Sequence, residues 1–364
     1  MSGLERLENG RAWVNFCDSL EKIGHRLLTD SVPDDGLTQV EGYRYLTRLL
    51  RLSLEKHVEF SDSDRPEFFS LSHETAKIGN DNPDNVYLNC TVSGEKSYLI
   101  SGHRGTVHYL SIESKAGGYG DGGDMTPTGH LELADIEIDE DGKFEIHVCM
   151  DKKHGNWLPM QSRTDSILIR QTFRDRSAEL PATFSIERVD SGDVVPLDPV
   201  KFIEALENTT PFVEGTVDLF RHWMDLFLAH ENSLPPNDQE MCLKAGGDPE
   251  IHYHNSRWAL SDDKALLIEF YPPVCRTWNF QLSNFWMESL DYRFHRISIN
   301  QDSAGGCDDG LIQILVSAFD PGVAFPNWLT TADHNCGAML LRYVGATSFP
   351  EIKTRVIDMS EIVS

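Results

Sequence analysis

The sequence lacks the short motifs that mark the commonest classes of active site. It contains no G-x-S-x-G nucleophile elbow, no G-x-x-x-x-G-K-[ST] phosphate loop, no H-E-x-x-H zinc site and no G-x-G-x-x-G turn in a βαβ unit. The glycine-rich segments GHRGT and GGYGDGG have few basic residues near them to hold a phosphate. We therefore do not expect the protein to use a nucleotide.

Basic residues are scarce. The chain has 32 Lys and Arg against 58 Asp and Glu, which gives a net charge of −26. Surfaces that bind phosphate backbones or anionic membranes are basic, so this balance argues against nucleic-acid and membrane partners. It predicts a highly soluble protein and suits a high-salt or acidic setting.

Paired cysteines and long apolar runs are also missing. The seven cysteines are scattered and show no C-x-x-C, which is typical of reduced buried thiols rather than of disulfides or zinc ligands. The first residues, MSGLERLENGRAWVNF, have no apolar signal core, and no apolar run approaches about 18 residues. We expect a soluble cytoplasmic protein, and the sequence leaves the oligomeric state open, a homo-oligomer included.

Helical and β-like segments alternate along the chain. Apolar residues at helical spacing predict helices over 11–29 and 38–57, and short alternating runs begin near residue 67. We divide the chain into an N-terminal helical segment (1–65), a first β lobe (66–197), connecting helices (198–240) and a second β lobe (241–364).

The two β regions resemble each other. Residues 138–173 and 306–344 each contain an Asp-Gly turn, an alternating strand, Asn-Trp-Leu and a final strand that carries an arginine. Asn156 precedes Arg170 by nearly the same separation as Asn327 precedes Arg342. This order predicts an α+β fold of two β-sandwich-like, jelly-roll-like lobes made by internal duplication, with helical segments packed on them. We expect the two arginines to fix the Asn-Trp-Leu loops, because a reaction centre needs only one copy.

The densest mixture of aromatic and polar residues lies at the start of the second β region. We predict a substrate pocket there, formed by Trp258, Trp278, Gln281, Asn284 and Trp286. On an extended strand, 278, 280, 282, 284 and 286 would share one face, and a pocket of indoles and amides suits an apolar ligand with a carbonyl or hydroxyl group. The alternative is that the indoles are core and the amides satisfy backbone groups.

The same region supplies candidate acid/base groups. His252 and His254 alternate, so both rings would project from one face of a strand, with Glu250 beside them. They could act as acid/base catalysts or ligate a transition metal, although spacing marks no third ligand. Asp291 and Arg293 are further catalytic candidates, for which a structural ion pair is the alternative.

Carboxylates elsewhere offer a second candidate for a divalent metal. Asp81 and Asp84, with Asn82 between them, could supply oxygen ligands, as could Asp121 and Asp124. Asn-Pro-Asp is first of all a turn, and the glycine-rich segment lacks the ordered spacing of a calcium loop. We therefore expect no resident metal.

Several longer motifs resemble the bacterial family known as domain of unknown function 1214. They are EGYRYLTRLL (41–50), DNPDNVYLNCTV (81–92), SYLISGHRGTVHYLSI (97–112), GNWLP (155–159), WNFQLSNFWMESLDYR (278–293), FDPG (319–322) and NWLTTA (327–332). The resemblance implies a β-rich double-lobed fold and a place in lipid, steroid or aromatic metabolism, but no catalytic residues. In the family's usual form DPG leads directly into NWL, whereas in this chain residues 323–326 (VAFP) separate the two motifs.

Two functions follow as hypotheses. The first is an enzyme that acts on a hydrophobic small molecule (a lipid, terpenoid, steroid or aromatic compound) by acid/base chemistry without an organic cofactor, as a lyase, isomerase or hydrolase. The second is a non-catalytic binding or accessory protein that uses the same pocket. We expect the cleft in the second lobe or where the lobes meet.

Overall fold

A computed structural model of the chain describes residues 3–29, 31–120, 124–190, 196–307, 309–323 and 325–362. Its N-terminal part is helical, with α1 (Gly3–Glu8), α2 (Arg11–Leu27), α3 (Gly36–Leu54) and a π-helical turn, η1 (Glu55–Glu59). Helix α3 begins where the Asp35 carboxylate accepts the backbone N–H of Thr38, a side-chain cap that satisfies one of the free donors of the first turn. The capping residue is thus Asp35.

Eight strands form the first lobe. They are β1 (Asn85–Thr91), β2 (Tyr98–His103), β3 (Tyr109–Ala116), β4 (Thr126–Glu132), β5 (Lys143–Cys149), β6 (Trp157–Pro159), β7 (Ser166–Thr172) and β8 (Thr183–Arg188), with a 3-10 turn, η2 (Leu133–Asp135), after β4. They make an inner sheet in the order β1-β7-β3-β4 and an outer sheet in the order β6-β5-β2-β8. Alternating apolar side chains from both sheets fill the space between them.

The second lobe repeats this topology strand for strand. Its strands are β9 (Ile251–Ala259), β10 (Lys264–Phe270), β11 (Thr277–Leu282), β12 (Ser298–Asn300), β13 (Ile312–Ser317), β14 (Trp328–Thr330), β15 (Cys336–Val344) and β16 (Lys353–Asp358), followed by α6 (Met359–Ile362). The sheet orders are β9-β15-β11-β12 and β14-β13-β10-β16, which are those of the first lobe with every strand number raised by eight. The predicted α+β architecture of two duplicated β-sandwich lobes is confirmed.

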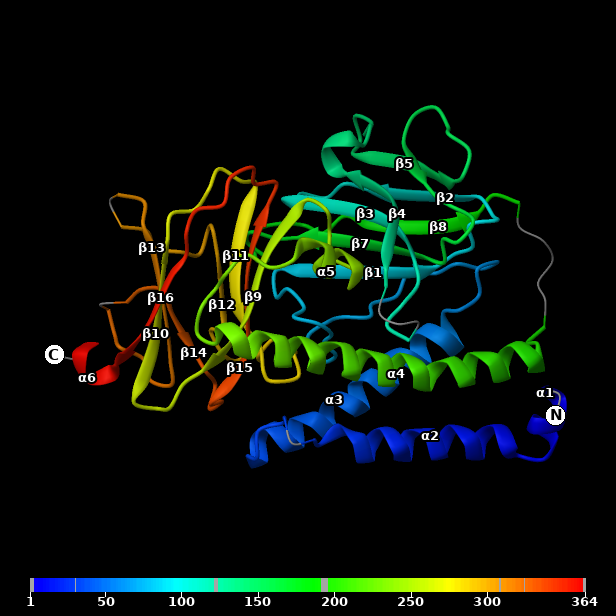
Figure 1. Cartoon of the computed structure of the whole chain (residues 1–364). Helices are drawn as coiled ribbons and strands as arrows, with labels where there is room; N and C mark the ends of the chain where they lie inside the picture. The colour runs from blue at the N-terminus through cyan, green and yellow to red at the C-terminus, as the bar shows by residue number, and fades with distance from the viewer. Residues whose placement is uncertain are drawn as a thin grey trace.

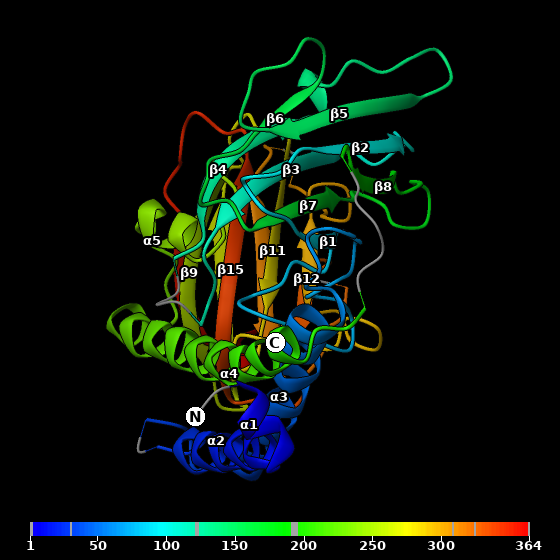
Figure 2. The same ribbon diagram turned by 90° about the vertical axis from the view of Figure 1, so that its right-hand side faces the viewer.

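A long helix joins the lobes and supports both. Helix α4 (Pro199–Phe227) follows Asp198, whose carboxylate caps it, and leads through η3 (Leu228–His230) and α5 (Gln239–Lys244) into β9. It runs beneath the two lobes, with α2 and α3 below it (Figures 1 and 2). Its apolar side chains pack with those of α2, α3 and the second lobe's inner sheet in one buried cluster. No helix within the described residues is long and apolar enough to cross a membrane.

The Asn-Trp-Leu motifs do the same work in both lobes. The Asn156 amide donates to the carbonyls of Glu137 (2.8 Å) and Glu145 (3.0 Å) and accepts the Glu137 N–H at 2.7 Å. The Asn327 amide likewise donates to the carbonyls of Gly305 (2.6 Å) and Gln313 (2.9 Å) and accepts the Gly305 N–H at 2.8 Å. Each asparagine therefore ties a loop to the edge of its outer sheet, and in the second lobe Arg296 adds a hydrogen bond to the Pro326 carbonyl at 2.6 Å.

Two structural expectations were wrong. Arg170 and Arg342 do not bond these loops; both leave their inner sheets on the opposite side and bond to the segments where the lobes meet. The strand predicted to run from 278 to 286 ends at Leu282, so that Trp286 lies in a loop and its indole packs against the helices rather than beside Trp278.

Candidate ligand-binding site

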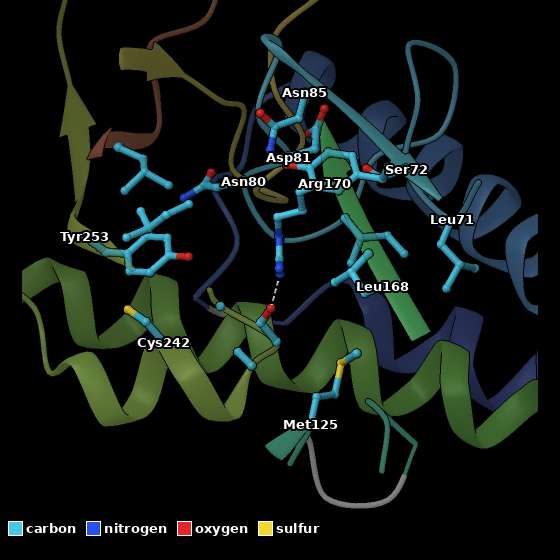
Figure 3. A pocket seen from close by; sticks show the side chains of 18 of the residues that line it. Leu71, Ser72, Asn80, Asp81, Asn85, Met125, Leu168, Arg170, Cys242 and Tyr253 are labelled. Carbon is cyan, nitrogen blue, oxygen red and sulfur yellow. Dashed lines mark hydrogen bonds between the residues drawn. The ribbon is translucent and has the colours of Figure 1, made fainter. Parts of the chain in front are cut away.

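A cavity of about 140 Å³ lies where the inner sheets of the two lobes meet α4 and α5. Figure 3 shows side chains from both lobes converging on it. Many lining residues occupy matching places in the two lobes: Asn85 and Ile251, Tyr87 and Tyr253, Asn89 and Asn255, Leu168 and Leu340, and Arg170 and Arg342. The cavity therefore lies on the internal pseudo-two-fold of the duplication.

Two short segments that precede β1 and β9 form part of the wall. Residues 79–85 (GNDNPDN) and 245–251 (AGGDPEI) align without a gap, and each segment ends two residues before its tyrosine of the pair. Gly79 and Asn80 have positive φ angles, and a Cβ on Gly79 would lie 2.3 Å from the Phe220 ring. The close approach of this segment to α4 therefore requires glycine.

The paired tyrosines are held alike and keep their hydroxyl protons free. The Tyr87 hydroxyl accepts the backbone N–H of Asn82 at 2.9 Å, and the Tyr253 hydroxyl accepts that of Asp248 at 2.8 Å. Neither hydroxyl donates to another group within the described residues. Burial raises the pKa of both phenols, so they stay protonated and can donate to a ligand oxygen.

The paired arginines cross from one lobe to the other. Arg170 on β7 donates to the carbonyl of Gly246 in the second lobe's segment (Figure 3), and Arg342 on β15 donates to the carbonyl of Asn80 in the first lobe's segment. Both guanidinium groups are more than nine-tenths buried. Each lobe thus supplies a cation that fixes the other lobe's wall.

Two buried amides face the cavity with unused hydrogen-bonding atoms. The side-chain oxygens of Asn80 and Asn85 have no hydrogen-bond partner in the described part of the chain, although both residues are almost fully buried. The side-chain nitrogen of Asn80, by contrast, donates to Asn255 Oδ1 at 3.0 Å. Leaving buried polar atoms unpaired costs about 1–3 kcal/mol each, so they mark places where a bound molecule or water would be stabilised.

Much of the remaining wall is apolar, with Ser72, Asn89 and Asn255 also lining the cavity. Phe220 and Trp223 from α4 meet at 5.7 Å with nearly perpendicular rings, and the Tyr119 ring lies 5.5 Å from Phe220. Leu71, Ile78, Met125, Leu168 and Leu340 complete this side. One half of the cavity therefore suits an apolar group and the other half suits oxygen atoms.

The tryptophans of the predicted pocket lie elsewhere. Trp258 and Trp278 are core residues between the two sheets of the second lobe, and the Trp258 indole donates to the Ala338 carbonyl at 3.0 Å. Trp286 donates to the Thr38 carbonyl at 2.8 Å beneath α3. Of the predicted set, Gln281 comes nearest to the cavity, because its side chain bonds Arg342 and the Asp81 carbonyl.

The predicted acid/base residues are also apart from this cavity. His252 and His254 do project from the same face of β9, with ring centroids 5.0 Å apart, but they point away from Tyr253; His252 stacks on Phe349. Burial lowers the pKa of His254 to about 4, helped by the neighbouring His252.

Asp291 and Arg293 form an ion pair at 2.6 Å in a turn. Asp291 and Asn284 line a second, polar cavity of about 230 Å³ beside α3, together with Glu41, Lys77 and His334. Apart from Asn284 and Asp291 in this second cavity, the structure does not bring the predicted catalytic and substrate-binding residues together.

The carboxylates considered for a metal act as hydrogen-bond acceptors. Asp81 accepts the N–H and hydroxyl of Ser289 at 2.9 and 2.8 Å, and Asp84 accepts the Asn300 amide at 3.2 Å. Burial raises the pKa of Asp84 to about 6. Among the described residues no three His, Cys, Asp or Glu side chains gather as metal ligands, and Asp121 lies outside them.

The fold and the cavity define the class of protein: an internally duplicated α+β protein of two β-sandwich lobes with a buried cavity where the lobes meet. No family model and no curated protein matches the chain. An uncharacterized protein from Burkholderia cenocepacia, known from its crystal structure, is 46% identical, with a TM-score of 0.96 over 98% of this chain and 99% of its own. The chain belongs to the family of that protein.

A second solved structure shares the fold alone. The VPA0106 protein from Vibrio parahaemolyticus is 12% identical and matches 86% of this chain and 98% of its own, with a TM-score of 0.50. The double-lobed architecture is therefore found in a chain whose sequence is very different.

Proposed function

We propose that the protein binds a small molecule with an apolar body and one oxygen-bearing polar group in the cavity between the lobes. The observation that carries this proposal is the two-sided wall. Aromatic side chains of α4 form one side, while Tyr87, Tyr253, Asn80 and Asn85 present unused hydrogen-bonding groups on the other. In a cavity built only for packing we would not expect two amide oxygens without a partner and two phenol protons unused on one wall.

The size of the cavity limits the ligand. A volume of about 140 Å³ is close to the roughly 150 Å³ of an engineered apolar cavity that takes up benzene. A single aromatic ring or a short branched chain fits, whereas a steroid or a long lipid would require the lobes to move apart. Of the compound classes expected from the sequence, small aromatic compounds are favoured.

Catalysis without an organic cofactor is the second candidate. Its support is that Asp81 lines the same cavity as the two phenol groups, with its carboxylate held by Ser289, and that carboxylates serve as general bases in enzymes. If a substrate is found, Tyr87→Phe and Tyr253→Phe should lower kcat more than they change KM. Unchanged kcat in both variants would rule out this catalytic role and leave ligand binding as the proposed function.

We also propose that the protein works in the cytoplasm, because all seven cysteines are free thiols, as is usual in a reducing compartment. On the motifs given above, we further propose that it belongs to the domain-of-unknown-function 1214 family.

The test is calorimetric titration of the purified protein with benzyl alcohol, phenol, benzamide and benzoate. We expect at least one of them to bind, and we expect Ala245→Leu, which adds three carbons at the cavity wall, to abolish that binding. Ala178→Leu, the same change at an exposed turn, is the control. The proposal is overturned if no probe binds the wild type, or if Ala245→Leu binds as the wild type does.

A further inference from the structure

The two halves of the cavity differ most where their arginines meet the neighbouring strand. Arg170 lies opposite Ser111 on β3, and Arg342 lies opposite Asn279 on β11. Two residues further along these strands come Glu113 and Gln281, which take equivalent places in the two lobes. The first half therefore has a carboxylate where the second half has a neutral amide.

In the first half the arginine's charge is paired. Arg170 Nη1 forms an ion pair with Glu113, and Asp248 Oδ2 lies 3.8 Å from the same nitrogen. Glu113 also pairs with Lys115 at 2.7 Å, and both of these side chains are completely buried. Burial alone would raise the pKa of Asp248, but hydrogen bonding from His130 and the charge of Arg170 lower it, so this carboxylate remains ionised. The charge of Arg170 thus faces two carboxylates.

In the second half no carboxylate reaches the arginine. Arg342 Nη1 donates to Gln281 Oε1 at 2.6 Å and Nη2 donates to the Asn80 carbonyl, both neutral acceptors. No described Asp or Glu oxygen lies within ion-pair distance of it. Burial lowers the pKa of Arg342, with Asp81 and Asp84 opposing that shift only through space. A buried cation without a paired anion is costly, and the remaining N–H groups of this guanidinium have no partner in the described chain.

From this asymmetry we infer that the ligand is a small monocarboxylate, whose carboxylate group binds Arg342 while its apolar body rests against Phe220 and Trp223. The inference rests on the proposed function, since it names the ligand class of the same cavity. A guanidinium group matches a carboxylate in shape and charge, and charge-assisted hydrogen bonds are about twice as strong as neutral ones. Tyr87 and Tyr253 can donate further hydrogen bonds to the carboxylate oxygens.

A dianion such as phosphate fits less well. The second half offers one uncompensated positive charge, and Asp81 lines the cavity close by. The unpaired side-chain oxygens of Asn80 and Asn85 are hydrogen-bond acceptors without a formal charge, so they add nothing that would hold a second negative charge. A single negative charge therefore balances the site, and a second would meet the Asp81 carboxylate.

The experiment compares benzoate with benzamide, which has nearly the same shape and no charge. We expect the wild type to bind benzoate at least about 10-fold more tightly, because about 1.4 kcal/mol of charge-assisted bonding corresponds to that factor. Gln281→Glu gives the second half the carboxylate of the first. It should weaken benzoate binding by about 10-fold or more and leave benzamide binding within about threefold. The matched reverse change, Glu113→Gln, should keep or tighten benzoate binding.

The outcomes separate the two proposals. If neither benzoate nor benzamide nor the neutral probes bind, the proposed function itself fails. If benzamide binds as tightly as benzoate, or if Gln281→Glu leaves benzoate binding unchanged, the cavity binds ligands but the carboxylate inference is overturned. The wild-type ratio decides the question even if Gln281→Glu does not fold, which circular dichroism would reveal.

Discussion

His254 should make the folded protein sensitive to acid. It lies on β9 with only 3% of its surface exposed, and its Nδ1 lies 3.3 Å from the Leu234 carbonyl, so the neutral ring donates that bond. Its Nε2 is buried and has no partner in the described chain. Protonating the ring would place a charge on this unpartnered nitrogen, beside His252. We therefore expect folding to hold His254 neutral.

The magnitude follows from the two pKa values. Burial lowers the pKa of His254 from its ordinary 6.5 to about 4 in the folded protein. Between these values the unfolded chain binds a proton that the folded chain does not, so stability is fully present above pH 6.5 and is lost as the pH falls toward 4. The loss is about 2 kcal/mol near pH 5 and about 3 kcal/mol near pH 4.

The assay is urea unfolding at a series of pH values, for the wild type and for His254→Asn. Asparagine keeps a donor near the Leu234 carbonyl but does not titrate, so the variant should show a shallower decline of the free energy of unfolding between pH 6.5 and 4. The smaller side chain should lower the free energy of unfolding by the same amount at every pH, which does not affect this slope. His147→Asn, at an exposed position of β5, is the control and should decline like the wild type. A variant that declines as steeply as the wild type would refute the reasoning.

Two further predictions concern stability, and denaturant unfolding checks both. Gly42→Ala should lower the free energy of unfolding by about 1–3 kcal/mol, because the new Cβ would lie 2.5 Å from the Trp286 ring. Gly24→Ala on α2, where no atom lies within 4 Å of the new Cβ, should raise it by about 0.5–1 kcal/mol. Equal effects of the two alanines would contradict this packing. Asn156→Ala and Asn327→Ala should each cost about 2–3 kcal/mol, since each removes three hydrogen bonds worth about 1 kcal/mol apiece. A large effect in one lobe alone would show that the two motifs are not equivalent.

The order of helices and strands and the duplication could be predicted because they depend on local patterns. Alternation, helical spacing and the repeated Asn-Trp-Leu motif are all properties of short stretches. The position of the cavity depends instead on which face of an inner sheet meets the other lobe. Both faces of β11 are buried, one in the sandwich core and one against the other lobe, so its aromatic and amide residues gave no indication of which face lines a site.

The residues around the cavity carried a signal that a longer comparison would have found. The predicted repeat began at residue 138 and therefore missed the first strands of each lobe. Aligning Asn82-Pro83-Asp84 with Asp248-Pro249-Glu250 brings Tyr87 opposite Tyr253. What no alignment could supply is the crossing of the arginines, because it depends on how one lobe is placed against the other.

The crossed arginines give the junction between the lobes the form of an isologous interface. In a symmetric dimer a residue i of one subunit contacts j of its partner while j contacts i, and here Arg170 and Gly246 repeat the contact of Arg342 and Asn80. A chain with a single lobe could complete this cavity only by pairing with a copy of itself, and both arginines would then have identical neighbours. Joining the lobes in one polypeptide removes that constraint. Glutamate can stand at 113 while glutamine stands at 281, so that both arginines bond across the junction but only Arg170 is paired with a carboxylate.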